Sequence, residues 1–227
     1  MRQRLCVVMP ALDEAEALPT ALAGRPKDVR IVVVDNGSAD ATAEVARGLG
    51  VEVVTEPRRG FGAACRAGLE AAAPAEVVVF MDADGSLDWA DLPAVTRPVL
   101  AGEADLVLGA RVVARREPGA MELHVALANR TLGALCGLLA GVPLRDLGPF
   151  RAGRRDALLA LDLRDRTYGW PLEMVLRAGR AGLRVAEVPV AYRLRTGTSK
   201  VTGRPWPTAK AAARMVWVLV RHATARK

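Results

Sequence analysis

Two aspartates separated by one residue, Asp82 and Asp84, are the residues whose types and spacing most clearly suggest chemistry. They follow the apolar run 77–81 and precede Gly85. Alternate carboxylates that leave a strand can converge on one divalent cation, and Mg²⁺ and Mn²⁺ prefer hard oxygen ligands and keep positions open for phosphate. A polar turn at the end of a strand gives the same pattern. Asp82 and Asp84 are therefore candidate metal ligands, with a turn as the alternative.

Three further charged residues follow apolar runs in the same way. Asp35 comes directly after the run 31–34, Glu14 follows the first run through Pro10, and Arg111 follows Leu-Gly-Ala. Asp35 could accept hydrogen bonds from a ribose or a base, although Asp-Asn-Gly-Ser is also strong turn chemistry. Glu14 could cap a helix or face a nucleotide. Together these residues favour a nucleotide–metal site over several unrelated turns.

Short apolar runs and helical patterns alternate through the first half of the chain. Strands are expected at 5–9, 31–34, 51–55, 77–81 and 106–108. Helices are expected at 14–23, 40–49, 63–73 and 91–100. This alternation predicts an α/β fold with a mostly parallel, Rossmann-like sheet and helices on both faces. In such sheets ligands bind at the carboxyl ends of the strands, where the charged residues above are placed.

The second half of the chain has a different pattern. It predicts helices at 124–141, 170–181 and 207–222, a strand at 184–190, a turn at 146–151 and a basic loop at 193–204. No internal repeat or low-complexity linker is present. We expect one domain over residues 1–227, with a nucleotide-sugar half (1–111), an acceptor half (112–204) and a C-terminal basic helix (205–227).

Length and composition limit the function classes. The chain has 227 residues, 51% of them hydrophobic and 25% charged, with a net charge of +7. This balance excludes a disordered or fibrous protein, and the aromatic content of 4% disfavours a base-stacking single-strand binder. The basic charge favours acidic partners. The three separated cysteines are expected to be buried, reduced thiols, as in a cytoplasmic protein.

The ordered set of motifs resembles the family 2 glycosyltransferases, which have a nucleotide-diphospho-sugar transferase (GT-A) fold. The resemblance is carried by the segments 8–14, 34–42, 82–84 and 109–111. Two later segments, 146–151 and 195–200, resemble the dolichyl- or polyprenyl-phosphate mannosyl- and glucosyltransferase branch.

The resemblance implies roles for individual residues. Asp84, Arg111 and Asp146 are implied in catalysis, and Asp82 and Asp84 in metal binding. Contacts to the nucleotide sugar are implied for Pro10, Leu12, Glu14, Val33, Asp35, Asp82, Ala83, Arg111, Arg195 and Lys200. Acceptor contacts are implied for Arg193, Arg195, Ser199 and Lys200.

The sequence departs from the family pattern at several positions. Asn36 replaces a second Asp that is common in the family, and Asp13 replaces a common Asn. The segment that ends at Lys200 is one residue shorter than in the mannosyl branch, so Arg193 competes with Arg195 for the same role.

The implied reaction moves a hexose from GDP-mannose or UDP-glucose to a polyprenyl or dolichyl phosphate, with Mg²⁺ or Mn²⁺, by an inverting displacement. Cations would stabilise the departing diphosphate. A phosphate acceptor is already ionised near neutral pH, so no strong base is needed. Asp146 could orient a cation, act as a weak base or cap a turn.

Two segments bear on membrane contact. The stretch 131–144 is uncharged, and a buried core helix is favoured there over an interfacial one. Near the C-terminus Lys210, Arg214, Trp217 and Arg221 fall on one helical face. Trp among cations is typical of membrane interfaces, and a solvated basic face is the alternative. We expect a cytoplasmic protein that binds an anionic membrane peripherally at its inner face.

Two other function classes fit parts of the sequence. The segment 80–87 resembles the first motif of haloacid-dehalogenase-like phosphatases, with Asp82 as nucleophile. The net charge fits a nucleic-acid-binding protein, although the basic residues are scattered, so no nucleic acid is expected as a partner. Glu173, in the first turn of a predicted helix, is interpreted as structural.

Overall fold

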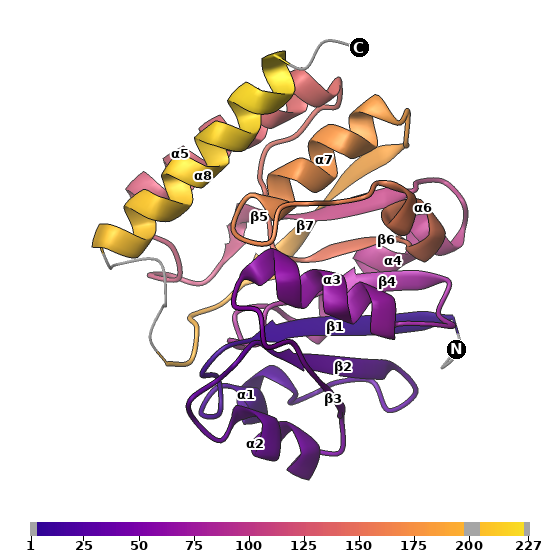
Figure 1. Cartoon of the computed structure of the whole chain (residues 1–227), viewed down its shortest axis with the longest axis vertical. Coiled ribbons are helices and arrows are strands. Elements are labelled where there is room, and N and C mark those ends of the chain that lie inside the picture. Colours follow the sequence, from indigo (N-terminus) through magenta and orange to yellow (C-terminus); the bar gives the residue numbers. More distant parts are fainter. Residues whose placement is uncertain (1–3, 198–204, 225–227) are drawn as a thin grey trace.

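One mixed sheet of seven strands forms the centre of the computed structural model, which describes residues 4–197 and 205–224 (Figure 1). The strands lie in the order β3-β2-β1-β4-β6-β5-β7. Their bounds are β1 Leu5–Ala11, β2 Arg30–Asp35, β3 Glu52–Thr55, β4 Val77–Phe80, β5 Leu106–Arg116, β6 Arg151–Arg154 and β7 Val185–Tyr192.

Strands β1 to β4 pair in parallel, as the alternation of strands and helices predicts. Ala11 is opposite Asp35, and Val8 is opposite Phe80. Strand β5 pairs with β7 in parallel, and β6 lies antiparallel between β4 and β5. The mostly parallel α/β fold expected from the sequence is therefore confirmed. Strand β6 was not expected, because its sequence Arg-Ala-Gly-Arg has no apolar pattern. It forms between β4 and β5, whose edges offer backbone hydrogen bonds to it on both sides.

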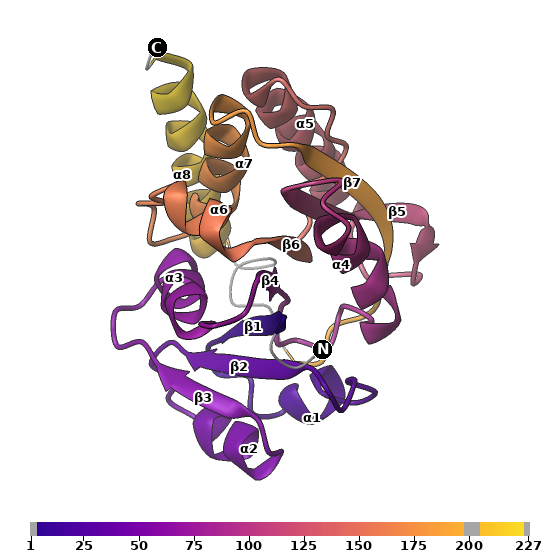
Figure 2. The ribbon, with the colours of Figure 1, turned by 90° about the vertical axis from the view of Figure 1, so that its right-hand side faces the viewer.

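Helices cover both faces of this sheet, and alternate strand residues point to the two faces. On β1, Val8 belongs to one hydrophobic cluster and Val7 to the other. Figure 2 shows α3, α7 and α8 on one side of the sheet and α4 on the other. The helices are α1 Leu18–Ala21, α2 Thr42–Gly48, α3 Phe61–Ala71, α4 Leu92–Leu100, α5 Leu123–Ala140, α6 Arg155–Ala160, α7 Trp170–Arg180 and α8 Pro205–Thr224, with a short 3₁₀ turn at Trp89–Asp91. The three cysteines are buried and unpaired, as expected.

Helix α5 packs through its small residues. Gly133, Cys136, Gly137 and Ala140 are buried, whereas Leu138 is 78% exposed. The backbone of α7 comes so close that a Cβ on Gly179 would lie 2.0 Å from the carbonyl oxygen of Ala140. The expectation of a buried core helix is therefore wrong for the large side chains, because the close approach leaves room only for small ones.

Helix α8 is fixed to the protein by part of its basic face. Arg214 donates a hydrogen bond from Nε to Oδ2 of the buried Asp165 at 2.7 Å. The guanidinium groups of Arg214 and Arg221 lie 4.2 and 5.1 Å from the centre of the Trp217 ring. The basic residues and Trp217 do lie together, and Arg214 keeps 39% of its side chain exposed beside Asp165, so contact of this face with lipid stays a prediction.

Within residues 4–197 and 205–224, every helix is too short or too polar to span a membrane.

Candidate active site

The acidic site lies where β1, β2 and β4 end. The register of these parallel strands brings the segments after Ala11, Asp35 and Phe80 to one edge of the sheet. Asp82 and Asp84 come from the β4 segment and Glu14 from the β1 segment. From the other half of the chain, the segment after β7 returns to this edge with Arg195. The fold therefore brings Arg195 to acids that are distant from it in sequence.

Asp84 is held in a fixed orientation. Its side chain is buried, and Oδ1 accepts hydrogen bonds from the backbone N–H of Ser86 at 3.0 Å and from the Ser86 hydroxyl at 2.6 Å. Gly85 between them has φ of +77°, a conformation that favours glycine. The second carboxylate oxygen, Oδ2, lies 3.3 Å from Nη2 of Arg195. One oxygen thus positions the carboxylate and the other faces the site.

Asp82 is half-buried beside Asp84. Burial raises the pKa of Asp82 to about 7, and the negative charges of Asp84 and Glu14 contribute in the same direction. The positive charges of Arg111 and Arg195 oppose this rise. Two carboxylates in one confined place repel each other, so a cation placed between them is electrostatically favourable.

Arg195 is the cation at this acidic edge. In addition to Asp84, it lies 3.9 Å from Oε1 of Glu14. Its Nε atom is buried and has no hydrogen-bond partner among the described residues. Two backbone bonds hold its segment against the acidic turn: Thr196 N–H donates to the carbonyl of Asp84, and Arg193 N–H donates to that of Ser86. Arg195 is therefore a partly exposed cation with donor capacity left for a ligand.

Arg193, the competitor of Arg195, points elsewhere. Its guanidinium forms an ion pair with Asp88. The structure thus brings Arg195, and not Arg193, to Asp84. Ser199 and Lys200, also expected in this loop, lie outside the described residues.

Arg111 and Asp146 form a bidentate pair. Nε and Nη2 of Arg111 each donate to a carboxylate oxygen of Asp146 at 2.8 Å, and the backbone N–H of Arg111 donates to the same group at 3.0 Å. Burial alone would raise the pKa of Asp146, but these bonds outweigh it and lower the pKa. The Arg111 guanidinium also lies 5.2 Å from the ring centre of Tyr192. Of the three roles considered for Asp146, the geometry matches the orientation of a cation.

The first two strand ends are linked by side-chain hydrogen bonds. The Ser38 hydroxyl accepts a hydrogen bond from the backbone N–H of Asp13 at 2.9 Å. Asp35 accepts a hydrogen bond from the backbone N–H of Ser38 at 3.1 Å, which is the turn chemistry considered above. Thr42 accepts from the N–H of Glu14 at 2.8 Å. These bonds fix the backbone at the ends of β1 and β2.

Four of the residues implied in nucleotide binding are apolar, and they differ in how deeply their side chains are buried. The side chains of Val33 and Ala83 are buried in the hydrophobic core, so the structure does not bring them to the site as side chains. Pro10 and Leu12 are half-buried at the end of β1.

Two polar residues have roles that the sequence did not reveal. The side-chain amide of Asn36 donates to the carbonyls of Glu56 and Arg58 at 3.0 and 2.8 Å, and its oxygen accepts from the N–H of Gly60 at 2.7 Å. Arg151 is buried and donates to the carbonyls of Gly148 and Pro171. The signal for Asn36 was its departure from the Asp that is common in the family, because an amide can both donate and accept hydrogen bonds, whereas an ionised Asp can only accept.

Glu173 is structural, as expected. Its carboxylate is buried and accepts hydrogen bonds from the backbone N–H groups of Arg164 and Asp165 at 2.9 and 2.7 Å. Nε of Arg177 donates to its other oxygen at 2.8 Å.

The donor set fits a divalent cation that is shared with a ligand. Asp82 and Asp84 offer hard carboxylate oxygens, which suit Mg²⁺ and Mn²⁺. Within residues 4–197 and 205–224 there is no group of three or more His, Cys, Asp or Glu side chains arranged to hold a metal ion. A magnesium-type site with one or two carboxylates, completed by water and substrate phosphates, matches this donor set.

Comparison with known proteins agrees with this fold and with a glycosyltransferase. Residues 6–161 match the model of the family described as "Glycosyl transferase family 2". An uncharacterised glycosyltransferase of Mycobacterium tuberculosis is 44% identical over 200 residues, which cover 87% of this chain and 89% of the relative. An undecaprenyl-phosphate mannosyltransferase of Micrococcus luteus is 33% identical over 221 residues, 88% of each chain.

A solved structure shows the same architecture. Glucosyl-3-phosphoglycerate synthase of M. tuberculosis, crystallised with Mn²⁺, UDP and glucosyl-3-phosphoglycerate, superposes with a TM-score of 0.77 at 24% identity. The match covers 99% of this chain and 81% of that one.

The sheet order and the acidic edge define a glycosyltransferase of the GT-A fold class. Within that class, the chain belongs to glycosyl transferase family 2. This assignment replaces the phosphatase and nucleic-acid-binding alternatives.

Proposed function

We propose that this glycosyltransferase moves a hexose from a nucleoside diphosphate sugar to a polyprenyl phosphate. The observation that carries the proposal is the contact of Arg195 with Asp84, which puts an arginine beside candidate metal ligands at the carboxyl end of β4. The name of the Micrococcus luteus relative supports a polyprenyl-phosphate acceptor. GDP-mannose and UDP-glucose are the two donors that the family resemblance suggests.

Asp82 and Asp84 would hold the metal in this reaction. When bound, Mg²⁺ or Mn²⁺ supplies positive charge that stabilises the departing diphosphate. The carboxylate of Asp84 is already oriented by Ser86, so little reorganisation is needed when a ligand arrives.

Two arginines would act on phosphate groups. Arg195 lies at the acidic edge, and its buried Nε has no hydrogen-bond partner among the described residues. Its guanidinium group would turn from Asp84 toward the diphosphate. Arg111 is oriented by its bidentate pair with Asp146. Arg suits the position of Arg195 because its planar group can bind phosphate through two donors, whereas Arg111 would act mainly through its charge, since its Nε and Nη2 donate to Asp146.

The bond changes need no strong base. A phosphate oxygen of the acceptor forms the new bond to the anomeric carbon, and the bond from that carbon to the diphosphate oxygen breaks. The nucleoside diphosphate leaves with the electron pair. The acceptor oxygen is already ionised near neutral pH, so the main task of the protein is to position the phosphates.

A lipid acceptor implies contact with a membrane surface, and the exposed apolar residues of α5 and α8 support this part of the proposal. Leu127 and Leu138 are 64% and 78% exposed, and Trp206 is 82% exposed. The two helices lie side by side in Figure 1. Arg130 and Arg145 flank the uncharged stretch 131–144 and complement anionic lipid. We propose peripheral binding at the inner face of the cytoplasmic membrane.

The test is release of nucleoside diphosphate from a panel of nucleotide sugars, with polyprenyl phosphate and either Mg²⁺ or Mn²⁺. We expect release with one donor, dependent on both the lipid and the metal. No release with any donor would contradict the proposal. Turnover of p-nitrophenyl phosphate, which a phosphatase would show, is expected to be absent.

A further inference from the structure

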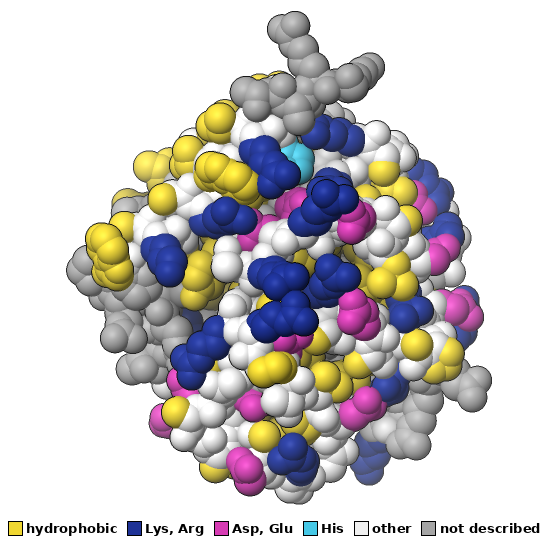
Figure 3. Space-filling view, in the orientation of Figure 1, with side chains coloured by type: hydrophobic (Ala, Val, Ile, Leu, Met, Phe, Trp, Pro, Cys, Tyr) yellow, Lys and Arg dark blue, Asp and Glu magenta, His cyan; other side chains and the backbone are white. Residues whose placement is uncertain are grey.

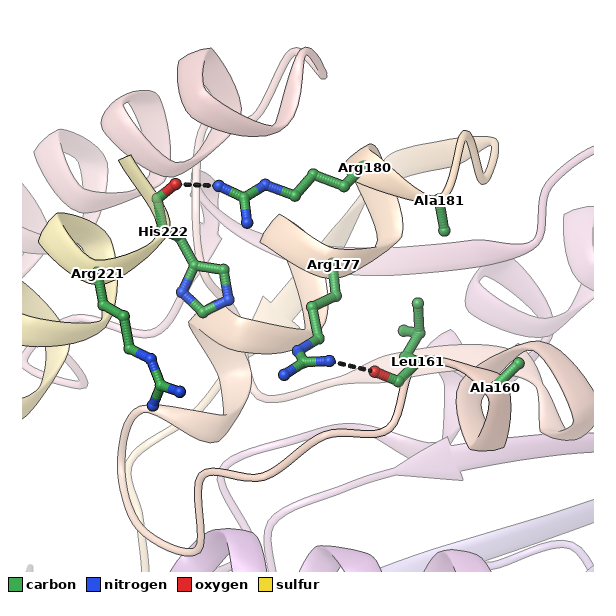
Figure 4. A pocket seen from close by; sticks show the side chains of 7 residues that line it. All are labelled: Ala160, Leu161, Arg177, Arg180, Ala181, Arg221 and His222. Carbon is green, nitrogen blue, oxygen red and sulfur yellow. Dashed lines mark hydrogen bonds between the residues drawn. The ribbon is translucent and has the colours of Figure 1, made fainter. Parts of the chain in front are cut away.

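A hollow lies between α6, α7 and the last turns of α8. Its volume is about 430 Å³ (Figure 4). Helix α7 begins near the acidic edge, where the Trp170 ring packs 4.9 Å from the Phe80 ring at the end of β4. The hollow lies at the opposite end of α7, beside Arg177 and Arg180. It is therefore separate from the candidate active site.

The hollow is lined by positive charge. Arg177, Arg180, Arg221 and His222 line it, and no Asp or Glu is among the described residues of its wall. In Figure 4 the guanidinium groups of Arg177 and Arg221 lie on either side of the His222 ring. Figure 3 shows dark blue side chains gathered over this part of the surface.

The ends of two helices explain only part of this arrangement. A helix C-terminus carries about half a negative charge, so basic residues in the last turn are ordinary. Arg180 serves in this way, because it donates to the backbone carbonyl of His222 and joins α7 to α8. Arg177 instead spans the wall, with Nε on Glu173 at 2.8 Å and Nη1 on the carbonyl of Leu161 at 3.1 Å.

The electrostatics of His222 are consistent with an excess of positive charge. Its ring is buried, and Nδ1 lies 2.9 Å from the carbonyl oxygen of Val218. Burial lowers the pKa of His222, and the charges of Arg180 and Arg177 lower it further, while the Val218 bond and Glu173 oppose them. An anion in the hollow would relieve the repulsion among these groups.

We propose that this hollow binds a phosphate monoester, held by the guanidinium groups of Arg177 and Arg221. Arginine on two sides of a small concave site suits the several acceptor oxygens of such a group. The phosphate can be free in solution or the headgroup of a lipid such as phosphatidic acid. The lipid source is compatible with the exposed Val216 and Val220, which lie on α8 before the hollow. The proposal does not depend on the glycosyl transfer proposed above.

The test is a titration of the full chain with inorganic phosphate, followed by the imidazole NMR signals. His222 is one of only two histidines, and His222→Asn assigns its signal. We expect a saturable shift of the His222 signal and a higher His222 pKa in the bound state. Arg221→Gln should weaken binding about tenfold, the effect of one charge-assisted hydrogen bond. Arg97→Gln, which removes the same charge from an exposed position on α4, should leave binding unchanged.

A second arm separates the two sources of phosphate. If inorganic phosphate has no effect, vesicles of phosphatidylcholine with phosphatidic acid should bind the wild type and the Arg97→Gln variant more strongly than Arg221→Gln. Arg177→Gln serves as a second variant if Arg221→Gln fails to fold, as judged by circular dichroism. The proposal is overturned if neither probe binds, or if the variants at Arg221 and Arg97 respond alike.

Discussion

Asp84 and Arg195 lie 3.3 Å apart at the carboxyl edge of the sheet, although they come from opposite halves of the chain. The backbone of Thr196 donates to the carbonyl of Asp84 at 2.9 Å, so the contact is supported by main-chain as well as side-chain atoms. The acidic turn and the segment after β7 are thereby joined into one site.

Removal of the Asp84 charge tests its role directly. In Asp84→Asn we expect kcat to fall about a hundredfold or more, the usual effect of losing an electrostatic stabiliser of the transition state. Metal-dependent release of nucleoside diphosphate is the measurement. Asp28→Asn, an exposed acid on the loop before β2, is the matched control and should keep full activity. Equal activity of the two variants would remove Asp84 from the mechanism.

The two arginines after β7 should behave differently. In Arg195→Ala we expect kcat/KM to fall about a hundredfold, because a charge-assisted contact to the diphosphate is lost. Arg193→Ala should cause a much smaller loss, since Arg193 pairs with Asp88 rather than with Asp84. Steady-state kinetics with varied donor measures both. A larger loss in Arg193→Ala would show that the family role belongs to Arg193.

Asp146→Asn should destabilise the fold because it leaves the Arg111 charge buried and unpaired. Breaking a buried ion pair costs about 3 kcal/mol. The folded pKa of Asp146 is below its ordinary value of 3.8, so its contribution is present above pH 4 and is lost as the pH falls through the folded pKa.

Urea denaturation of wild type and Asp146→Asn at two pH values measures this contribution. The difference in unfolding free energy should be full at pH 7 and smaller at pH 3. A difference that is the same at both values would show that the carboxylate charge of Asp146 does not stabilise the fold.

Asn36→Asp restores the residue common in the family, yet it should destabilise this chain. The change removes the two donations to the carbonyls of Glu56 and Arg58 and places a carboxylate against them. We expect a loss of about 2 kcal/mol, the cost of leaving buried polar groups unpaired. Thermal unfolding is the measurement, and Asn129→Asp on α5 is the control. A variant as stable as wild type would show that the loop has another way to satisfy these groups.

The exposed leucines of α5 should contribute to membrane binding. Leu127→Ser with Leu138→Ser should reduce flotation with anionic liposomes, because each buried leucine contributes about 2 kcal/mol. Leu159→Ser on α6, also exposed, should have no effect. Equal flotation of all three proteins would place the membrane contact elsewhere or show that there is none.

The positions of the acids could be predicted from the sequence because they depend on local patterns. An apolar run followed by Asp82 and Asp84 predicts a strand end, and parallel pairing brings such ends together. The pair of Arg111 and Asp146 could not be predicted, because its partners are 35 residues apart. The pair also depends on the turn before β6, a strand made by its neighbours rather than by its own pattern.

The sequence predicted where helix α5 begins and ends, but not which of its faces is buried. Helical periodicity shows that small and large residues occupy different faces, and burial of the large ones is the usual outcome. In this chain α7 packs against Cys136 and Ala140, and the backbone of residues 142–146 covers Gly133 and Gly137, while Leu138 is exposed. These close backbone approaches, which the sequence pattern does not give, decide which face is inside.

The most direct test is transfer of radiolabelled hexose from GDP-mannose or UDP-glucose to polyprenyl phosphate by the full chain, with Mn²⁺ present. We expect label in the organic phase for wild type and Asp28→Asn, and almost none for Asp84→Asn. Absence of labelled lipid with either donor, or equal transfer by Asp84→Asn and wild type, would contradict it.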